Sequence, residues 1–173
     1  MSVKVQLLST PFEDCAHAHG MARIRLFRSI LRADGRRQLE LEQEEVVKNL
    51  ITDVGLNWIV DQISAVPAVA AMSHMGLGTD GTPPKATNVA LGAAIAGSRL
   101  AILSGPTQSS PGKLTYSTIW DLGVATSPTV AESGTFNAPA AGDMLARIAF
   151  GPFDKTAEHI LSIERIWTFT RGE

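Results

Sequence analysis

The chain has 173 residues, of which 45% are hydrophobic and 18% charged, with a formal net charge of −2. This length fits one domain with its own core, and the small negative charge gives no overall attraction to nucleic acid or to anionic membranes. A single cysteine excludes an internal disulfide framework, and no apolar run reaches the about 18 residues of a membrane span, so we expect a soluble protein.

Residues 1–20 are predicted to form an extended N-terminal arm, because no sustained periodicity is present there. Within it, Cys15, His17 and His19 would share one side of an extended chain and are the candidate metal ligands. Same-face neighbours on one strand are about 7 Å apart, which strains tetrahedral coordination. No second pair of ligands is placed to close the site. We therefore predict no metal site.

A β-hairpin is predicted over residues 22–47. Residues 23–26 and 39–42 alternate with the period of two that is typical of strands, and Asp34-Gly35 between them favours a tight turn. One strand carries four arginines and the other four glutamates: Arg23, Arg25, Arg28, Arg32, Glu40, Glu42, Glu44 and Glu45. Opposite charges that face each other across the hairpin explain the basic cluster better than phosphate binding does.

Residues 49–65 form the clearest predicted helix. Asp53, Asn57 and Asp61 recur every four residues and make one polar stripe, while apolar side chains cover the remaining circumference. A helix with so little polar surface is expected to be buried, either by a sheet of its own chain or by neighbouring subunits. Asn49 or Thr52 can cap its first turn.

The chain after residue 67 is predicted to consist of short strands and turns. Strands are expected over 70–77, 100–103, 114–122, 144–150 and 161–169. Loops or turns are expected over 104–112, up to 137 before the 144–150 strand, and over 151–157. Together with the helix, these strands predict a mainly β fold, a β-sandwich with the jelly roll among its topologies, in one domain over residues 21–173.

The segment from Gly76 to Gly81 matches Gly-x-Gly-x-x-Gly, the pattern of dinucleotide-binding loops. That function requires a helix directly behind the glycines, because the phosphates bind at the helix N-terminus. Pro83 and Pro84 follow instead, and neither can donate a backbone N–H. No acidic residue stands about 20 positions further on to hold a ribose. We interpret the segment as a turn at a strand end and predict no cofactor.

No catalytic motif is evident elsewhere in the sequence. It lacks a nucleophile elbow, a Gly-Lys-Ser/Thr phosphate loop, a His-Glu-x-x-His pair and spaced cysteine pairs. His74 and His159 are isolated on predicted strands, where a structural histidine is the ordinary interpretation. Nothing pairs the carboxylates Asp121, Glu132 and Asp143, which are expected to be solvated. We predict that the protein is not an enzyme.

Three segments, in this order, resemble structural proteins of tailed bacteriophages. They are the helix opening at 49–56, the glycine segment at 75–92 with Arg99 behind it, and residues 132–138 followed by the Asp-Met-Leu-Ala-Arg strand at 142–150. The similarity is to capsid decoration (head-fibre) proteins and to the amino-terminal parts of tail fibres, and it covers about residues 46–170. Asn88-Val89 and Thr135 depart from the Asp-Thr and Leu that are usual in this group.

The resemblance implies a non-catalytic virion protein, a homo-oligomer and most simply a trimer. We expect a decoration or cement protein that is made in the bacterial host cytoplasm, binds the outside of the phage head and stabilises contacts between major capsid subunits. The alternative is a tail or baseplate component such as a fibre adaptor. A third hypothesis is a small metal-binding β-sandwich enzyme. Low charge, an apolar helix and an arm agree with a subunit that buries surface against its own copies and a shell.

Overall fold

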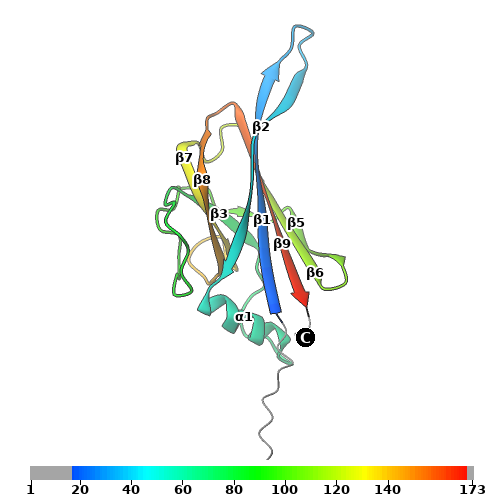
Figure 1. Cartoon of the computed structure of the whole chain (residues 1–173), viewed down its shortest axis with the longest axis vertical. Coiled ribbons are helices and arrows are strands. Elements are labelled where there is room, and N and C mark those ends of the chain that lie inside the picture. Colours follow the sequence, from blue (N-terminus) through cyan, green and yellow to red (C-terminus); the bar gives the residue numbers. More distant parts are fainter. Residues whose placement is uncertain (1–16, 171–173) are drawn as a thin grey trace, which may run out of the picture.

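The computed structural model describes residues 17–170. This part of the chain contains nine strands and one helix (Figure 1). Their bounds are β1 His17–Leu31, β2 Arg37–Ile51, α1 Asp53–Ile63, β3 His74–Gly78, β4 Leu100–Ala101, β5 Ser104–Ser110, β6 Lys113–Trp120, β7 Ser127–Phe136, β8 Met144–Lys155 and β9 His159–Thr170. The prediction of a mainly β fold with a single helix is confirmed.

The strands form one antiparallel series in the order β4-β3-β7-β8-β2-β1-β9-β6-β5. Its two halves are joined only where Leu50 and Ile51 of β2 pair with Arg147 and Ala146 of β8. At this narrow junction the series folds over, so that β3, β7 and β8 form one layer and β1, β9, β6 and β5 form the other (Figure 1). The result is a sandwich made from one folded sheet, and its order differs from the eight-stranded double sheet of a jelly roll.

The hydrophobic core fills the space between these two layers. Alternation along β9 turns Leu161, Ile163 and Trp167 inward, as predicted, and Trp120 of β6 pairs with Leu161 in register. The opposite layer supplies the predicted inward face of β8, in which Ile148 is fully buried. Burial of these large side chains provides the main driving force for closing the sandwich.

Helix α1 begins later and is less buried than predicted. Residues 49–51 complete β2, and Thr52 caps the helix: its hydroxyl accepts from the Gly55 amide at 3.0 Å and donates to the Met144 carbonyl oxygen at 2.6 Å. Gly55 is the one buried helix residue, and a Cβ there would contact the Leu145 carbonyl oxygen. Burial by a sheet of the same chain is therefore a wrong prediction, whereas burial by neighbouring subunits stays a prediction.

Strands β1 and β2 form the predicted hairpin, which extends further at both ends than residues 22–47. The register places Arg25 opposite Glu44 and Arg28 opposite Glu40, which confirms the facing of charges for these two pairs. Gly35, with a φ of 77°, lies in the tip. The arm boundary is wrong, because residues 17–20 belong to β1 and pair with residues 167–170 of β9. Residues 1–16 lie outside the described part of the chain.

Three segments that were expected to be loops are strands. Residues 104–110 form the edge strand β5, residues 127–136 form β7, and β8 continues through residues 151–155. Their Ser-, Thr-, Pro- and Gly-rich composition carries no clear alternation. In β7, residues 130–136 are all buried, because the strand is covered on both faces. A strand covered on both faces loses the pattern from which strands are recognised.

Candidate functional site

A buried ion pair lies in the layer formed by β3, β7 and β8. The side chains of Glu132 on β7 and Arg147 on β8 are 0% and 2% exposed, and the guanidinium Nε donates to the carboxylate Oε2 at 2.7 Å. The same oxygen accepts from the Gly92 amide at 3.0 Å, and Oε1 accepts from the Ala93 amide at 2.8 Å. These charge-assisted bonds compensate for removing the carboxylate from water.

The same arginine holds the loop of residues 79–99 between β3 and β4. Its Nη2 donates to the carbonyl oxygen and to Oδ2 of Asp80, at 3.1 and 3.0 Å, and Nη1 donates to Asn88 Oδ1 at 3.3 Å. Hydrogen bonds from Thr82, followed by the charge of Arg147, lower the pKa of the Asp80 carboxyl. The loop is thus fixed on the outer side of β7 and β8 by a connected polar network.

The glycine segment serves this packing. Gly78 ends β3, as the predicted strand end requires; a Cβ there would contact Glu132 Oε1 and lie 2.6 Å from the Ala93 carbonyl oxygen. Gly81 differs, since its nearest neighbour would be the Ala131 Cβ at 3.6 Å. None of the three motif glycines has a positive φ. The close approach of two backbones therefore accounts for the glycine at position 78.

Two of the three segments that resemble phage proteins meet at this network, and the helix opening at 49–56 does not take part in it. Residues 75–92 supply Asp80 and Asn88, residues 132–138 supply Glu132, and residues 142–150 supply Arg147. Behind them, the Arg99 guanidinium lies 3.6 Å from the centre of a ring in β7 and donates to a backbone carbonyl. The prediction that Glu132 is a solvated loop carboxylate is wrong. These residues attach a long loop to a sheet layer, which is a structural role.

Both histidines singled out in the sequence have hydrogen-bond partners. His74 on β3 has Nδ1 2.8 Å from the Ser73 hydroxyl. His159 begins β9, and its Nδ1 accepts from the Thr156 amide at 3.1 Å. Its Nε2 therefore carries the proton and donates to Glu42 Oε2 at 2.7 Å. Glu42 was expected to face an arginine, and no sequence pattern indicated this partner across 117 positions.

The remaining candidates are not gathered into one site. Asp121 follows β6 and Asp143 precedes β8, and no hydrogen bond within the described residues joins these two carboxylates. His17 and His19 lie in β1, with their backbones opposite residues 170 and 168 of β9. Cys15 lies outside the described residues. Within residues 17–170, no group of three His, Cys, Asp or Glu is arranged to hold a metal ion.

Arg165 is a cation buried between the two layers. Its Nη1 donates to Asn49 Oδ1 at 2.8 Å, and its Nη2 donates to the Ser133 carbonyl oxygen at 2.7 Å. No ion pair of the described residues includes it. Burial lowers the pKa of the guanidinium to about 9, so it remains charged at neutral pH. It ties β9 to β2 and β7 across the sandwich.

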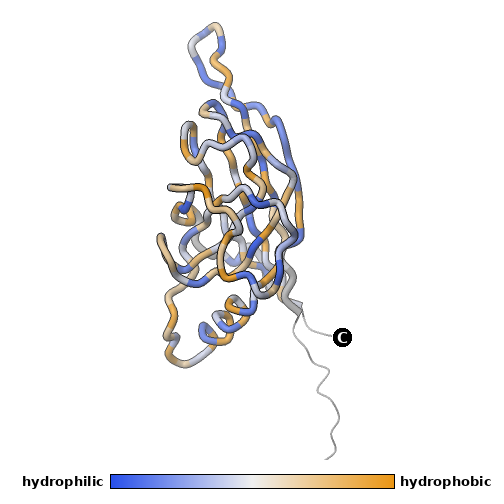
Figure 2. Tube along the Cα trace, turned by 90° about the vertical axis from the view of Figure 1, so that its left-hand side faces the viewer, coloured by the Kyte–Doolittle hydropathy of each residue, from blue (hydrophilic) through white to orange (hydrophobic). Residues whose placement is uncertain are grey.

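The end of the β1–β2 hairpin projects beyond the sandwich (Figures 1 and 2). We call residues 28–41 the distal hairpin. Pairing of β1 with β9 stops at Arg28, and β2 joins β8 only at residues 50 and 51. The two strands therefore continue as a ribbon with no third strand and no second layer. Of residues 28–41, only Ser29 is buried and only Gln38 is half-buried.

Three leucines line one face of the distal hairpin. Ser29 pairs with Leu39, Phe27 pairs with Leu41, and Leu31 lies two positions beyond Ser29. Alternation therefore places Leu31, Leu39 and Leu41 on the same face, where they are 66%, 50% and 53% exposed. The distal hairpin contains four arginines and two acidic residues, Asp34 and Glu40. Its net charge is therefore positive, although the net charge of the whole chain is −2.

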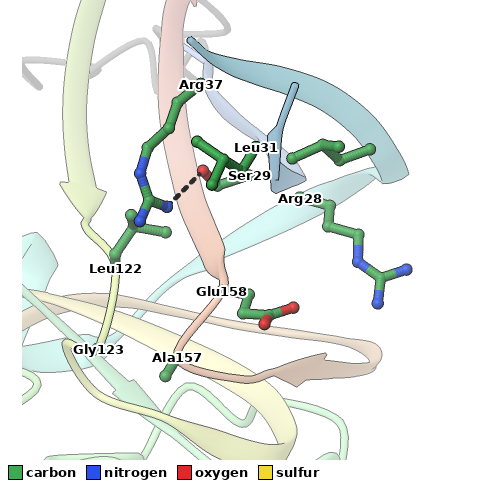
Figure 3. A pocket seen from close by; sticks show the side chains of 9 residues that line it. Arg28, Ser29, Leu31, Arg37, Leu122, Gly123, Ala157 and Glu158 are labelled. Carbon is green, nitrogen blue, oxygen red and sulfur yellow. Dashed lines mark hydrogen bonds between the residues drawn. The ribbon is translucent and has the colours of Figure 1, made fainter. Parts of the chain in front are cut away.

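An open cavity of about 750 Å³ lies at the root of the distal hairpin (Figure 3). Arg28, Leu31 and Arg37 line it from the hairpin, and Leu122 and Glu158 line it from two connections of the body. The Arg37 Nη1 donates to the Ser29 hydroxyl at 3.0 Å, which holds that arginine along the ribbon. A wide recess with mixed apolar and charged walls suits protein side chains better than a small, enclosed ligand.

No helix within residues 17–170 has the length and hydropathy that crossing a bilayer requires. Comparison of the chain with protein-family models, with curated proteins and with solved structures finds no match.

Proposed function

We propose that this protein is a non-enzymatic virion structural protein, a decoration or cement protein that binds the outside of a phage head and stabilises contacts between major capsid subunits. The observation that carries the proposal is the distal hairpin, a ribbon beyond the sandwich with Leu31, Leu39 and Leu41 exposed on one face. In this proposal, the hairpin is the part that enters the shell.

The exposed leucines argue for a partner surface. A two-stranded ribbon without a packed face is only marginally stable in water. Burial of apolar area contributes about 25 cal/mol per Å², so covering three leucines on a shell would stabilise both the ribbon and the complex. Contiguous apolar side chains on a projecting element are typical of protein-binding sites.

The charge of the hairpin narrows the chemistry of the partner. Arg28, Arg32, Arg36 and Arg37 lie in the same hairpin as the leucines, so we infer that the complementary surface has an apolar groove with carboxylates at its rim. A groove at the boundary between two capsid subunits would receive the hairpin and join them. Rim ion pairs of this kind steer association and weaken as salt is added.

The sequence resemblance supports the same proposal. Two of the three segments that resemble phage decoration proteins supply the network that attaches the 79–99 loop, and Glu132 and Arg147 are its centre. Such a brace stiffens the body behind the hairpin. The resemblance alone supplies the phage head as the setting.

The experiment is co-sedimentation of the purified chain with capsid shells that lack it. The triple variant that combines Leu31→Ser, Leu39→Ser and Leu41→Ser is expected to weaken shell binding at least about tenfold, a change of about 1.4 kcal/mol. The control is Val89→Ser, which removes a 67% exposed aliphatic side chain from the 79–99 loop. Equal binding by the triple variant and the wild type would overturn the role of the hairpin.

Copy number decides between head and tail. A decoration protein accompanies the many subunits of the shell, whereas a fibre adaptor or baseplate component is present in a few copies at one vertex. Quantitative mass spectrometry of purified virions, relative to the major capsid protein, measures this ratio. A ratio close to that of the tail proteins would move the protein to the tail.

A further inference from the structure

Helix α1 presents an apolar stripe that nothing in the described chain covers. Leu56, Val60 and Ile63 are 50%, 69% and 80% exposed. Their i, i+4, i+7 spacing places them on one face of the helix, whereas Gly55 is the residue that packs on β8. The stripe is uncharged, and the carboxylate of the neighbouring Asp61 is held by two backbone amides of residues 68 and 69.

An apolar cavity of about 230 Å³ adjoins this stripe. It opens between α1 and the ends of β6 and β9, where Trp58, Ile59, Leu114, Trp167 and Phe169 line it. None of its nine lining residues is charged. Ile63 belongs both to the cavity wall and to the stripe, so the two features form one continuous apolar surface.

We propose that this surface binds a second copy of the same chain, with the stripe of one copy seated over the cavity of the other. A row of aliphatic side chains and an apolar recess lie side by side on one chain, so two copies related by rotation can each supply both parts. Aliphatic side chains such as Leu56 and Val60 match the recess in chemistry. A charged partner would find no counter-charge among the lining residues.

The position of α1 agrees with this occupant. The helix lies at one end of the long axis of the molecule, and the distal hairpin lies at the other (Figure 1). Self-association through α1 therefore leaves the hairpin free for a different partner. The inference goes beyond the proposed function and can be tested without a shell, because it needs only the purified chain.

The test is light scattering coupled to gel filtration, over a range of concentrations of the full chain. The wild type is expected to elute as an oligomer that dissociates on dilution, and Val60→Asp is expected to weaken self-association at least about tenfold. Val89→Asp places the same charge at an equally exposed valine outside the surface and should leave the mass unchanged.

Two outcomes overturn the proposal. The first is a wild type that stays monomeric at every concentration. The second is a wild-type oligomer whose mass Val60→Asp leaves unchanged. Leu56→Ser is the second variant; it adds no charge, and circular dichroism reports whether either variant stays folded. If a monomeric wild type loses shell binding on Val60→Asp, the stripe belongs to the shell interface and the second copy is excluded.

Discussion

Glu132 and Arg147 stand on neighbouring strands and meet at 2.7 Å with both side chains buried. The pair faces away from the hydrophobic core and into the 79–99 loop, where Asp80 accepts from the same guanidinium. Loops of this length that contain no helix or strand are uncommon in compact domains, and this one is held by specific polar anchors. The pair therefore determines where the loop lies, and through it the shape of one side of the molecule.

Removing Glu132 should destabilise the protein strongly. Glu132→Ala leaves Arg147 buried without its main counter-charge, and breaking a buried pair costs about 3–5 kcal/mol. We expect the lower end of this range, since Asp80 continues to pair with the guanidinium. Urea denaturation measures the loss. Asp80→Asn is the control with a smaller expected effect, because that carboxylate is 27% exposed; an equal loss in the two variants would contradict this account.

How much of this site can be predicted from the sequence depends on the register between β7 and β8. The glycine segment and the Glu-Ser-Gly and Leu-Ala-Arg segments stand out as patterns, yet nothing in them says that Glu132 and Arg147 are partners. They pair because β7 and β8 run antiparallel with three register shifts, which hydrophobic periodicity does not encode. Residues 130–136 are buried on both faces, so their sequence lacks the alternation that identifies an ordinary strand.

The two ends of the Gly-x-Gly-x-x-Gly match should differ in tolerance. Gly78→Ala forces a Cβ against the Ala93 carbonyl oxygen and the Glu132 carboxylate, and overpacking of this kind costs about 1–3 kcal/mol. Gly81→Ala meets only ordinary contact and should change the free energy of unfolding little. Thermal denaturation of both variants measures these changes in stability. If the glycines served nucleotide binding, both substitutions would weaken binding of the nucleotide and neither would destabilise the fold.

Thr52 should contribute to stability through its hydroxyl. Thr52→Val keeps the shape of the side chain but leaves the Gly55 amide and the Met144 carbonyl without their partner. Loss of a helix N-cap costs about 0.5–2 kcal/mol. Denaturation measures this loss, and hydrogen exchange at the Gly55 amide should accelerate. Thr52→Ser retains the hydroxyl and is expected to recover most of the stability; if it is as unstable as the valine variant, capping is not the cause.

Helix α1 and the β1–β2 hairpin show which parts of the fold hydrophobic periodicity and turn residues can predict. The turn at Asp34-Gly35 and the alternation around it predicted the hairpin, because a hairpin is a local structure. The length of its projection depends on where β9 ends, which is a tertiary property. For α1, the apolar circumference was correctly identified. Amphipathicity tells which surface is apolar and not what covers it. The pattern therefore allowed burial by a sheet of the same chain or by neighbouring subunits, and only the first of these is wrong.

Acid should weaken the connection that follows α1. Hydrogen bonds from the backbone amides of Ala68 and Val69 lower the pKa of the Asp61 carboxyl below the usual range of an aspartate. Because the folded-state pKa is the lower one, the carboxylate contributes stability above about pH 4 that is lost as the pH falls through the folded value. Asp61→Asn should flatten the pH dependence of stability below pH 4. An NMR titration checks the sign, and a raised Asp61 pKa would contradict it.

Truncation at the N-terminus should separate the arm from the strand that follows it. Deleting residues 2–16 removes none of the described strand pairs, so the melting temperature should stay unchanged while shell binding falls if the arm crosses onto a neighbour. Deleting residues 2–20 also removes the pairing of residues 17–20 with residues 167–170 of β9, so the melting temperature should fall. Each lost kcal/mol lowers the melting temperature by about 2–4 °C for a chain of this size. Equal melting temperatures for the two truncations would show that residues 17–20 add nothing to β1, and undiminished shell binding by the shorter deletion would remove the arm from the interface.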